Sequence, residues 1–203
     1  MNKLVFLNLG LLSFFCLLVF ADKSRPNVII IFADDQGYGD LSCFGSEKIR
    51  TPHIDQLAKE GRRFTSFMVA SPVCTPSRAA LLTGCYPKRV GMHQHVLFPS
   101  SNKGLNPEEF TLADHFKSIG YSTACFGKWH LGHHKEVLPT SNGFDTYFGI
   151  PYSNDMNHPD NKGKPKGGAD GMDILWNDPD STITKWKTPL FEDEKIVELP
   201  VDQ

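Results

Sequence analysis

The chain is organised around the stretch Cys74-Thr75-Pro76-Ser77-Arg78-Ala79-Ala80-Leu81-Leu82-Thr83-Gly84. Proline suits the first turn of a helix because its missing N–H would have no partner there, and the alanines and leucines that follow favour helix. Gly84 can end such a helix. The pattern therefore predicts a short helix that begins near Cys74. Because backbone N–H groups are unpaired at a helix N-terminus, we expect this position to favour an anion beside the cysteine.

A second stretch, earlier in the chain, places two carboxylates after an apolar run. Residues 26–33 are apolar and rich in β-branched side chains, which is typical of a strand buried on both faces of a parallel sheet. Asp34 and Asp35 follow directly, at the end of the expected strand where α/β sheets bind ligands. Such a pair can bind a hard divalent cation through oxygen. The alternative interpretation of the pair is a solvated turn.

The rest of the chain alternates between helical and strand-like patterns. Thr51 and Pro52 are typical of a helix start, and Gly61 is typical of a helix end. The other expected elements are a short strand at 64–70, an exposed loop at 86–106, a helix at 108–119, a strand at 121–126 and a strand-like run at 196–199. This alternation predicts an α/β fold with a largely parallel sheet flanked by helices.

A lysine and a group of histidines follow the strand expected at 121–126. Lys128 and His130 are two residues apart, so both side chains can point to one side of the strand end. A lysine can hold an anionic oxygen and a histidine can transfer protons near neutral pH, although simple surface exposure is the alternative for such a pair. The spacing of His130, His133 and His134 does not favour a transition-metal site.

The first 21 residues differ from the rest of the 203-residue chain. Residues 1–21 contain a long apolar block after Lys3, and we interpret them as a secretory signal peptide, with an uncleaved membrane anchor as the alternative. We therefore expect an exported protein, periplasmic or secreted, without stable membrane insertion. The net charge of −2 gives no strong field that would favour nucleic acid or an anionic lipid surface.

The expected mature chain contains the cysteines Cys43, Cys74, Cys85 and Cys125. Four cysteines in an exported protein are compatible with two disulfides, for which three pairings exist. If Cys74 is consumed by a modification, at most one disulfide remains, and its pairing among the other three cysteines stays open.

Three signatures in the sequence resemble those of the type I sulfatases, which belong to the alkaline-phosphatase-like superfamily. They read DDQGYGD at residues 34–40, CTPSRAALLTG at residues 74–84 and GYSTACFGKWHLG at residues 120–132. Gly143-Phe144-Asp145, followed by Phe148-Gly149, adds a fourth signature. The resemblance covers residues 26 to about 155 and implies an alkaline-phosphatase-like sheet, with residues 22–203 forming the N-terminal part of a sulfatase catalytic domain.

This resemblance implies a sulfuric ester hydrolase that cleaves sulfate esters, of carbohydrates or in aryl test substrates, by transesterification followed by elimination. Cys74 would be oxidised to formylglycine by a formylglycine-generating enzyme, and its hydrated aldehyde would be the nucleophile. Asp34, Asp35 and Cys74 would bind calcium. The remaining implied roles are that Arg78 holds the hydrated formylglycine, Lys128 binds sulfate and His130 takes a proton from the second hydroxyl.

The sequence departs from the family pattern in one respect. The family's metal site is completed by an acidic residue and an asparagine from a later strand, and no convincing counterpart precedes Gln203. We therefore expect a fragment of a longer sulfatase or a catalytically incomplete chain. A non-catalytic anion-binding module is an alternative function. A phosphoryl-transfer enzyme of the same superfamily is disfavoured, because its nucleophile would normally be serine or threonine rather than Cys74.

Overall fold

A computed structural model describes residues 25–99, 101–156 and 188–199. The chain forms two units, one ending at Gly61 and the other beginning at Arg62. The signal peptide predicted at residues 1–21 lies outside the described residues. Within the described ranges, none of the helices combines the length and the apolar character needed to cross a bilayer.

The first unit contains one α-helix in its described part. Its elements are the 3-10 helices η1 (Tyr38–Asp40) and η2 (Ser42–Phe44) and the helix α2 (Pro52–Glu60). The predicted ends of α2 are confirmed, since Thr51 occupies the N-cap, Pro52 the first position and Gly61 the C-cap. The Thr51 hydroxyl donates to Asp55 Oδ1 at 2.9 Å rather than capping the helix backbone. The same carboxylate accepts the Cys43 N–H at 2.9 Å, which ties η2 to the first turn of α2.

The prediction of a buried strand at residues 26–33 is wrong. The run has no regular secondary structure, and Ile29 is 82% exposed. A strand requires hydrogen bonds to a neighbouring strand, and the sheet found in the described residues is built entirely from later segments. The strand predicted at 64–70 is also wrong, because this segment has no strand and its Phe67 is 77% exposed.

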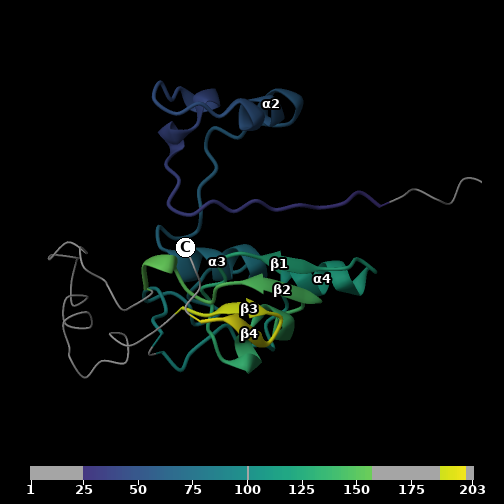
Figure 1. The fold of residues 1–203 in the computed structure, drawn as a ribbon. Helices are drawn as coiled ribbons and strands as arrows, with labels where there is room; N and C mark the ends of the chain where they lie inside the picture. The colour runs from purple at the N-terminus through teal and green to yellow at the C-terminus, as the bar shows by residue number, and fades with distance from the viewer. Residues whose placement is uncertain (1–24, 100, 157–187, 200–203) are drawn as a thin grey trace, which may run out of the picture. The chain divides into compact units, whose positions relative to one another are not determined.

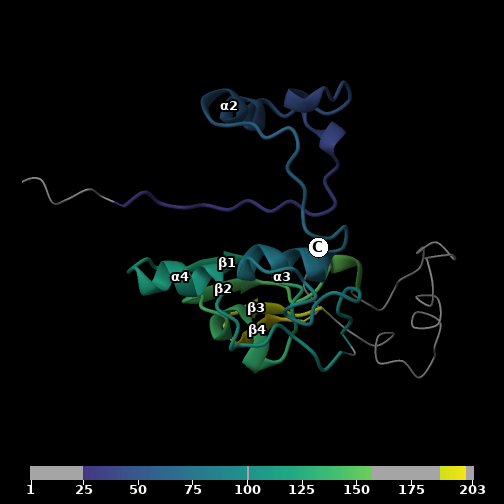
Figure 2. The same cartoon turned by 180° about the vertical axis from the view of Figure 1, so that it is seen from behind.

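The second unit combines α-helices with a four-stranded sheet in its described part (Figure 1). The α-helices and strands are α3 (Cys74–Thr83), α4 (Leu112–Ser118), β1 (Ala124–Phe126), β2 (Thr146–Gly149), β3 (Leu190–Glu192) and β4 (Lys195–Glu198). Its 3-10 helices are η3 (Lys135–Val137), η4 (Pro139–Ser141) and η5 (Asn154–Met156). Opposite views place α3 and α4 near β1 and β2, with the β3–β4 hairpin farther from both helices (Figures 1 and 2). The helix predicted to begin at Glu108 begins later, at Leu112, because Thr111 is its N-cap and forms a capping box with Asp114 in the first turn.

The strands follow the order β1-β2-β3-β4 in the sheet. β1 and β2 are parallel, with Cys125 opposite Tyr147, and the other two neighbouring pairs are antiparallel. The α/β class is confirmed, and the described sheet is mixed, with one parallel pair. β1 lies within the strand predicted at 121–126, and β4 overlaps the strand-like run at 196–199.

Loop residues contribute much of the core of the second unit. The prediction of a loop at 86–106 is confirmed, but its expected exposure is wrong. Its core side chains are Val90, Met92, Leu97, Phe98 and Leu105, which join Ala79 of α3, Tyr147 of β2 and Phe191 of β3 in one cluster. Their irregular spacing explains the difference, because burial within a loop produces neither a helical nor a strand period.

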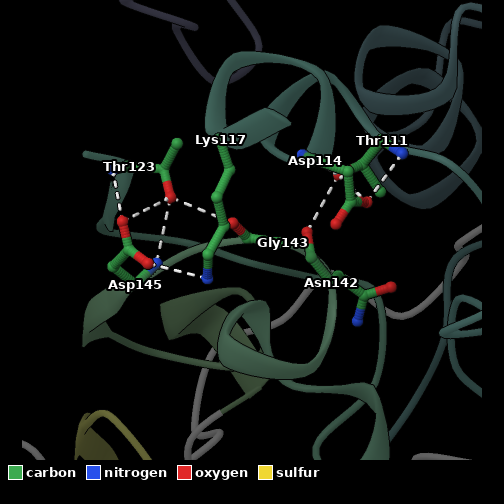
Figure 3. A network of polar contacts seen from close by, with 7 residues as sticks. All are labelled: Thr111, Asp114, Lys117, Thr123, Asn142, Gly143 and Asp145. Carbon is green, nitrogen blue, oxygen red and sulfur yellow. Dashed lines mark hydrogen bonds and ion pairs between the residues drawn. The ribbon is translucent and has the colours of Figure 1, made fainter. Parts of the chain in front are cut away.

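A polar network joins the end of α4 to the starts of β1 and β2 (Figure 3). The Thr123 N–H donates to Asp145 Oδ2 at 2.9 Å, and the Thr123 hydroxyl donates to the Gly143 carbonyl oxygen at 2.9 Å. Lys117 Nζ lies 2.7 Å from Asp145 Oδ1. Gly143 has a φ of +90°, and a Cβ there would lie 2.6 Å from the Asp114 backbone nitrogen. The Gly-Phe-Asp signature therefore has a structural explanation: Gly143 permits close packing against α4, and Asp145 holds the start of β1.

Candidate active site

Helix α3 places Cys74 at its first position, and the predicted bounds of this helix are confirmed. Val73 is the extended N-cap, and Gly84 ends the helix with a φ of +65°, while its N–H donates to the Ala80 carbonyl oxygen at 2.9 Å. The buried residues of the helix are Thr75, Pro76, Ser77 and Ala79. Cys74 itself is half-buried, at the end of the helix where unpaired N–H groups favour negative charge.

A close contact between two glycines directs the chain after β1. The Gly127 N–H donates to the Phe148 carbonyl oxygen at 2.9 Å, and the Ile150 N–H donates to the Gly127 carbonyl oxygen at 3.2 Å. A Cβ on Gly149 would overlap this Gly127 oxygen, so the approach of the two backbones requires glycine at position 149. The position of Lys128, the next residue, depends on this contact.

Lys128 and Arg78 lie together with Cys74 at the start of α3. The Lys128 ammonium donates to Cys74 Sγ at 3.3 Å. Arg78 lies one turn further along the helix and donates from Nη1 to the Lys128 carbonyl oxygen at 2.6 Å. All three side chains are half-buried. Two cations beside a helix N-terminus create an environment that favours an anion.

Thr75 connects the helix start to His130. Its hydroxyl donates to the His130 carbonyl oxygen at 2.8 Å and accepts the Leu97 N–H at 3.0 Å. Thr75 is fully buried, with 0% of its surface exposed, so both backbone groups are satisfied away from water. Three segments distant in sequence therefore meet beside Cys74.

A hydrogen bond to a backbone carbonyl holds one nitrogen of the buried His130 ring. His130 is 1% exposed, and its backbone has a φ of +58°, which residues other than glycine rarely adopt. Its Nε2 lies 2.9 Å from the Leu97 carbonyl oxygen. Because a carbonyl oxygen can only accept, Nε2 carries the hydrogen in this contact, which leaves Nδ1 as the ring nitrogen that can accept a proton.

Asp34 and Asp35 belong to the first unit. Both carboxylates are exposed in a bend, and Asp35 has a φ of +52°. Adjacent carboxylates that face solvent offer the oxygen atoms that a hard divalent cation binds. A metal site that combines them with Cys74 would join residues of the two units, and it stays a prediction.

Cys43, Cys74, Cys85 and Cys125 form no disulfide with one another, so the structure contains none of the bridges that the sequence left open. Cys125 lies on β1, packed against the core. Burial raises the pKa of its thiol to about 11, and the nearby Arg78 opposes part of this shift. The Cys125 thiol is therefore protonated at neutral pH.

The structure adds two residues to the site that sequence reasoning missed. Thr75 stands between two residues of the recognised signature, but its paired contacts to distant backbone groups leave no local pattern. Leu97 belongs to the loop whose predicted exposure is wrong. The apolar triplet Val96-Leu97-Phe98 within that loop is the signal that could have indicated burial.

Known proteins are similar to this chain in sequence. The sulfatase family model matches residues 26–188. Arylsulfatase G of Rattus norvegicus is 46% identical over 182 residues, a match that covers 88% of this chain and 34% of the relative. Arylsulfatase A of Homo sapiens is 54% identical over 133 residues, which cover 64% of this chain and 26% of the relative.

A similarity in structure accompanies the similarity in sequence. The crystal structure of Ps i-CgsB superposes with a TM-score of 0.68 at 35% identity, covering 86% of this chain and 37% of that one. The chain thus spans about a third of the length of arylsulfatase G and of this structural neighbour. Because the family model matches most of its residues, the chain belongs to the sulfatase family.

Proposed function

We propose that the protein hydrolyses sulfate esters and that Cys74 is the precursor of its nucleophile. The observation that carries this proposal is the 3.3 Å contact between Lys128 Nζ and Cys74 Sγ at the start of α3. It joins two separate signatures of the sequence at a position that favours an anion. A sulfate ester carries the negative charge that such a position stabilises.

An unmodified cysteine would not complete this reaction. A thiolate that attacked sulfur would retain the sulfuryl group, because no second oxygen is present to expel it. We therefore propose that a formylglycine-generating enzyme oxidises Cys74. One hydroxyl of the hydrated aldehyde supplies the oxygen that attacks sulfur. The second hydroxyl then loses its proton and re-forms the aldehyde, which breaks the bond between the carbon and the sulfated oxygen and expels sulfate.

The side chains around Cys74 would then have distinct roles. The Lys128 ammonium would hold an anionic sulfuryl oxygen, and the Arg78 guanidinium would hold the modified side chain in place. His130 would accept a proton at Nδ1, since its Nε2 is hydrogen-bonded to the Leu97 carbonyl oxygen. Preorganised charge of this kind usually makes the largest contribution to catalysis.

The chemistry of the donor atoms fits calcium after the modification. Calcium prefers oxygen ligands, which Asp34 and Asp35 supply as carboxylates. The sulfur of an unmodified Cys74 would be a soft ligand, whereas an oxygen at this position would complete a hard donor set. Calcium, when bound, would offset negative charge on the sulfuryl oxygens.

We propose a sulfated carbohydrate as the substrate of an exported enzyme. One structural neighbour, Ps i-CgsB, was crystallised in complex with k-i-k-neocarrahexaose. The apolar block within residues 1–21 supports export, as in a secretory signal peptide.

The test co-expresses the chain with a formylglycine-generating enzyme. Mass spectrometry of the tryptic peptide 64–78 would report the modification, and hydrolysis of an aryl sulfate would report turnover. We expect formylglycine at position 74 of the chain. In a whole sulfatase that contains this chain, we expect activity that calcium chelation removes, and loss of activity in Cys74→Ala. An aryl phosphate serves as the competing substrate. Preferred hydrolysis of the phosphate, or an unchanged rate in Cys74→Ala, would contradict the proposal.

A further inference from the structure

The histidine of the candidate site packs against a buried tyrosine. Tyr152 is 0% exposed, and its ring forms a T-shaped contact with the His130 ring, with centroids 5.5 Å apart and planes at 79°. At its other end, the Tyr152 hydroxyl forms a 2.7 Å hydrogen bond with His133 Nδ1. We propose that Tyr152, held in place by His133, is a positioning residue that fixes the orientation of the His130 ring. The proposal rests on the proposed role of His130 as proton acceptor.

The backbone couples the tyrosine and the histidine. The His130 N–H donates to the Pro151 carbonyl oxygen at 3.0 Å, and Pro151 directly precedes Tyr152. The Trp129 N–H donates to the Ile150 carbonyl oxygen at 2.9 Å, so residues 129–130 run alongside residues 150–151. A movement of Tyr152 is therefore transmitted to the backbone that sets the His130 side chain.

The contact between the Tyr152 and His130 rings restricts the orientation of the His130 ring, which the hydrogen bond at Nε2 does not fix by itself. The contact from Nε2 to the Leu97 carbonyl oxygen fixes one atom of the His130 ring but permits rotation about that bond. The T-shaped contact with the Tyr152 ring restricts this rotation. The direction of Nδ1, the nitrogen that would accept the proton, is then determined by Tyr152.

The hydrogen bond between His133 and Tyr152 joins two groups that are both neutral near pH 7. Burial, and to a smaller extent the neighbouring His134, lower the pKa of His133 to about 4. Burial also raises the pKa of Tyr152 well above its ordinary value. Both groups are thus neutral near pH 7, and their hydrogen bond persists without bringing a positive charge to the His130 site.

The experiment measures the His130 ring directly and does not depend on turnover. The full chain is labelled with 15N-histidine, and the exchange of the His130 Nε2–H with water is followed by NMR. We expect exchange about tenfold faster in Tyr152→Phe and in His133→Ala, because either change removes the hydrogen bond between Tyr152 and His133. His133→Asn keeps a polar atom at the place of Nδ1 and should restore the slow exchange. The matched control is Tyr86→Phe, at a tyrosine that is 76% exposed, where we expect no change.

A second measurement separates this inference from the proposed function. With the modified protein and an aryl sulfate, Tyr152→Phe should lower kcat while KM is retained, because substrate binding is not altered. Faster exchange without turnover in any variant, the unsubstituted chain included, would support the positioning role and contradict sulfate hydrolysis. Unchanged exchange in folded Tyr152→Phe and His133→Ala would overturn the positioning role, whatever the activity. If Tyr152→Phe does not fold, the comparison of His133→Ala with His133→Asn decides.

Discussion

Helices α2 and α3 have similar sequence signals and very different surroundings. Each has a proline in its first turn and a glycine at its C-cap. No residue of α2 is buried, whereas the first turn of α3 is largely buried and is bonded to segments more than twenty residues away in the sequence. Local signals thus fix where a helix begins and ends, while contacts distant in sequence decide whether it can support a site.

The largest effect is expected where two backbones meet at Gly149. Because a Cβ there would overlap the Gly127 carbonyl oxygen, Gly149→Ala should lower the free energy of unfolding by about 4 kcal/mol or more. Urea unfolding followed by tryptophan fluorescence would measure the change. The control is Gly39→Ala, where a Cβ meets nothing within 4 Å and we expect a change within about 0.5 kcal/mol. Equal effects at the two glycines would refute the close contact.

A smaller loss is expected at the start of α3. Thr75→Val keeps the shape of the side chain but leaves the His130 carbonyl and the Leu97 N–H without their hydroxyl partner, which should cost about 3 kcal/mol of unfolding free energy. Thr75→Ser retains the hydroxyl and should cost clearly less. The same urea titration distinguishes the two, and equal losses would show that packing rather than hydrogen bonding matters at this position.

The stability of the second unit should also depend on pH through His133. Its pKa is lowered from 6.5 to about 4 in the folded state, so the unfolded chain binds a proton in this window while the folded chain does not. Stability should therefore fall as the pH drops from 6.5 towards 4, by up to about 2 kcal/mol for a partly exposed ring. Urea midpoints at several pH values would show the slope. His133→Asn should reduce the dependence of stability on pH. An unchanged dependence in this variant would mean that other groups cause it.

The smallest effect is expected on α2. Leu57 is 62% exposed, so Leu57→Ala removes little buried surface and should change the free energy of unfolding by less than about 0.5 kcal/mol. Circular dichroism during urea titration would follow the helix. A loss of several kcal/mol would mean that Leu57 is covered in solution and that α2 resembles α3 more closely than its surroundings indicate.

The same contrast explains what the sequence could predict. The ends of α2 and α3 were predictable because caps act within a few residues. The state of residues 26–33 was not predictable in this way. Their apolar composition indicates burial in a strand, but it does not say which neighbouring strand would supply the hydrogen bonds. That Cys74 and Lys128 belong to one site was implied by the resemblance to the sulfatases, and the two side chains are in contact. The role of Thr75 depends on contacts to residues 22 and 55 positions away and has no local signal.

The core position of Cys125 has a consequence for the chemistry of the whole chain. Three cysteines, Cys74, Cys85 and Cys125, lie in the second unit, but the one on β1 keeps its proton at neutral pH, since its pKa is raised to about 11. Because the thiolate is the species that reacts with electrophiles and oxidants, the protonated Cys125 thiol reacts slowly with both. Alkylating reagents can thus be used near pH 7 to count the accessible thiols of the folded chain with little interference from this one.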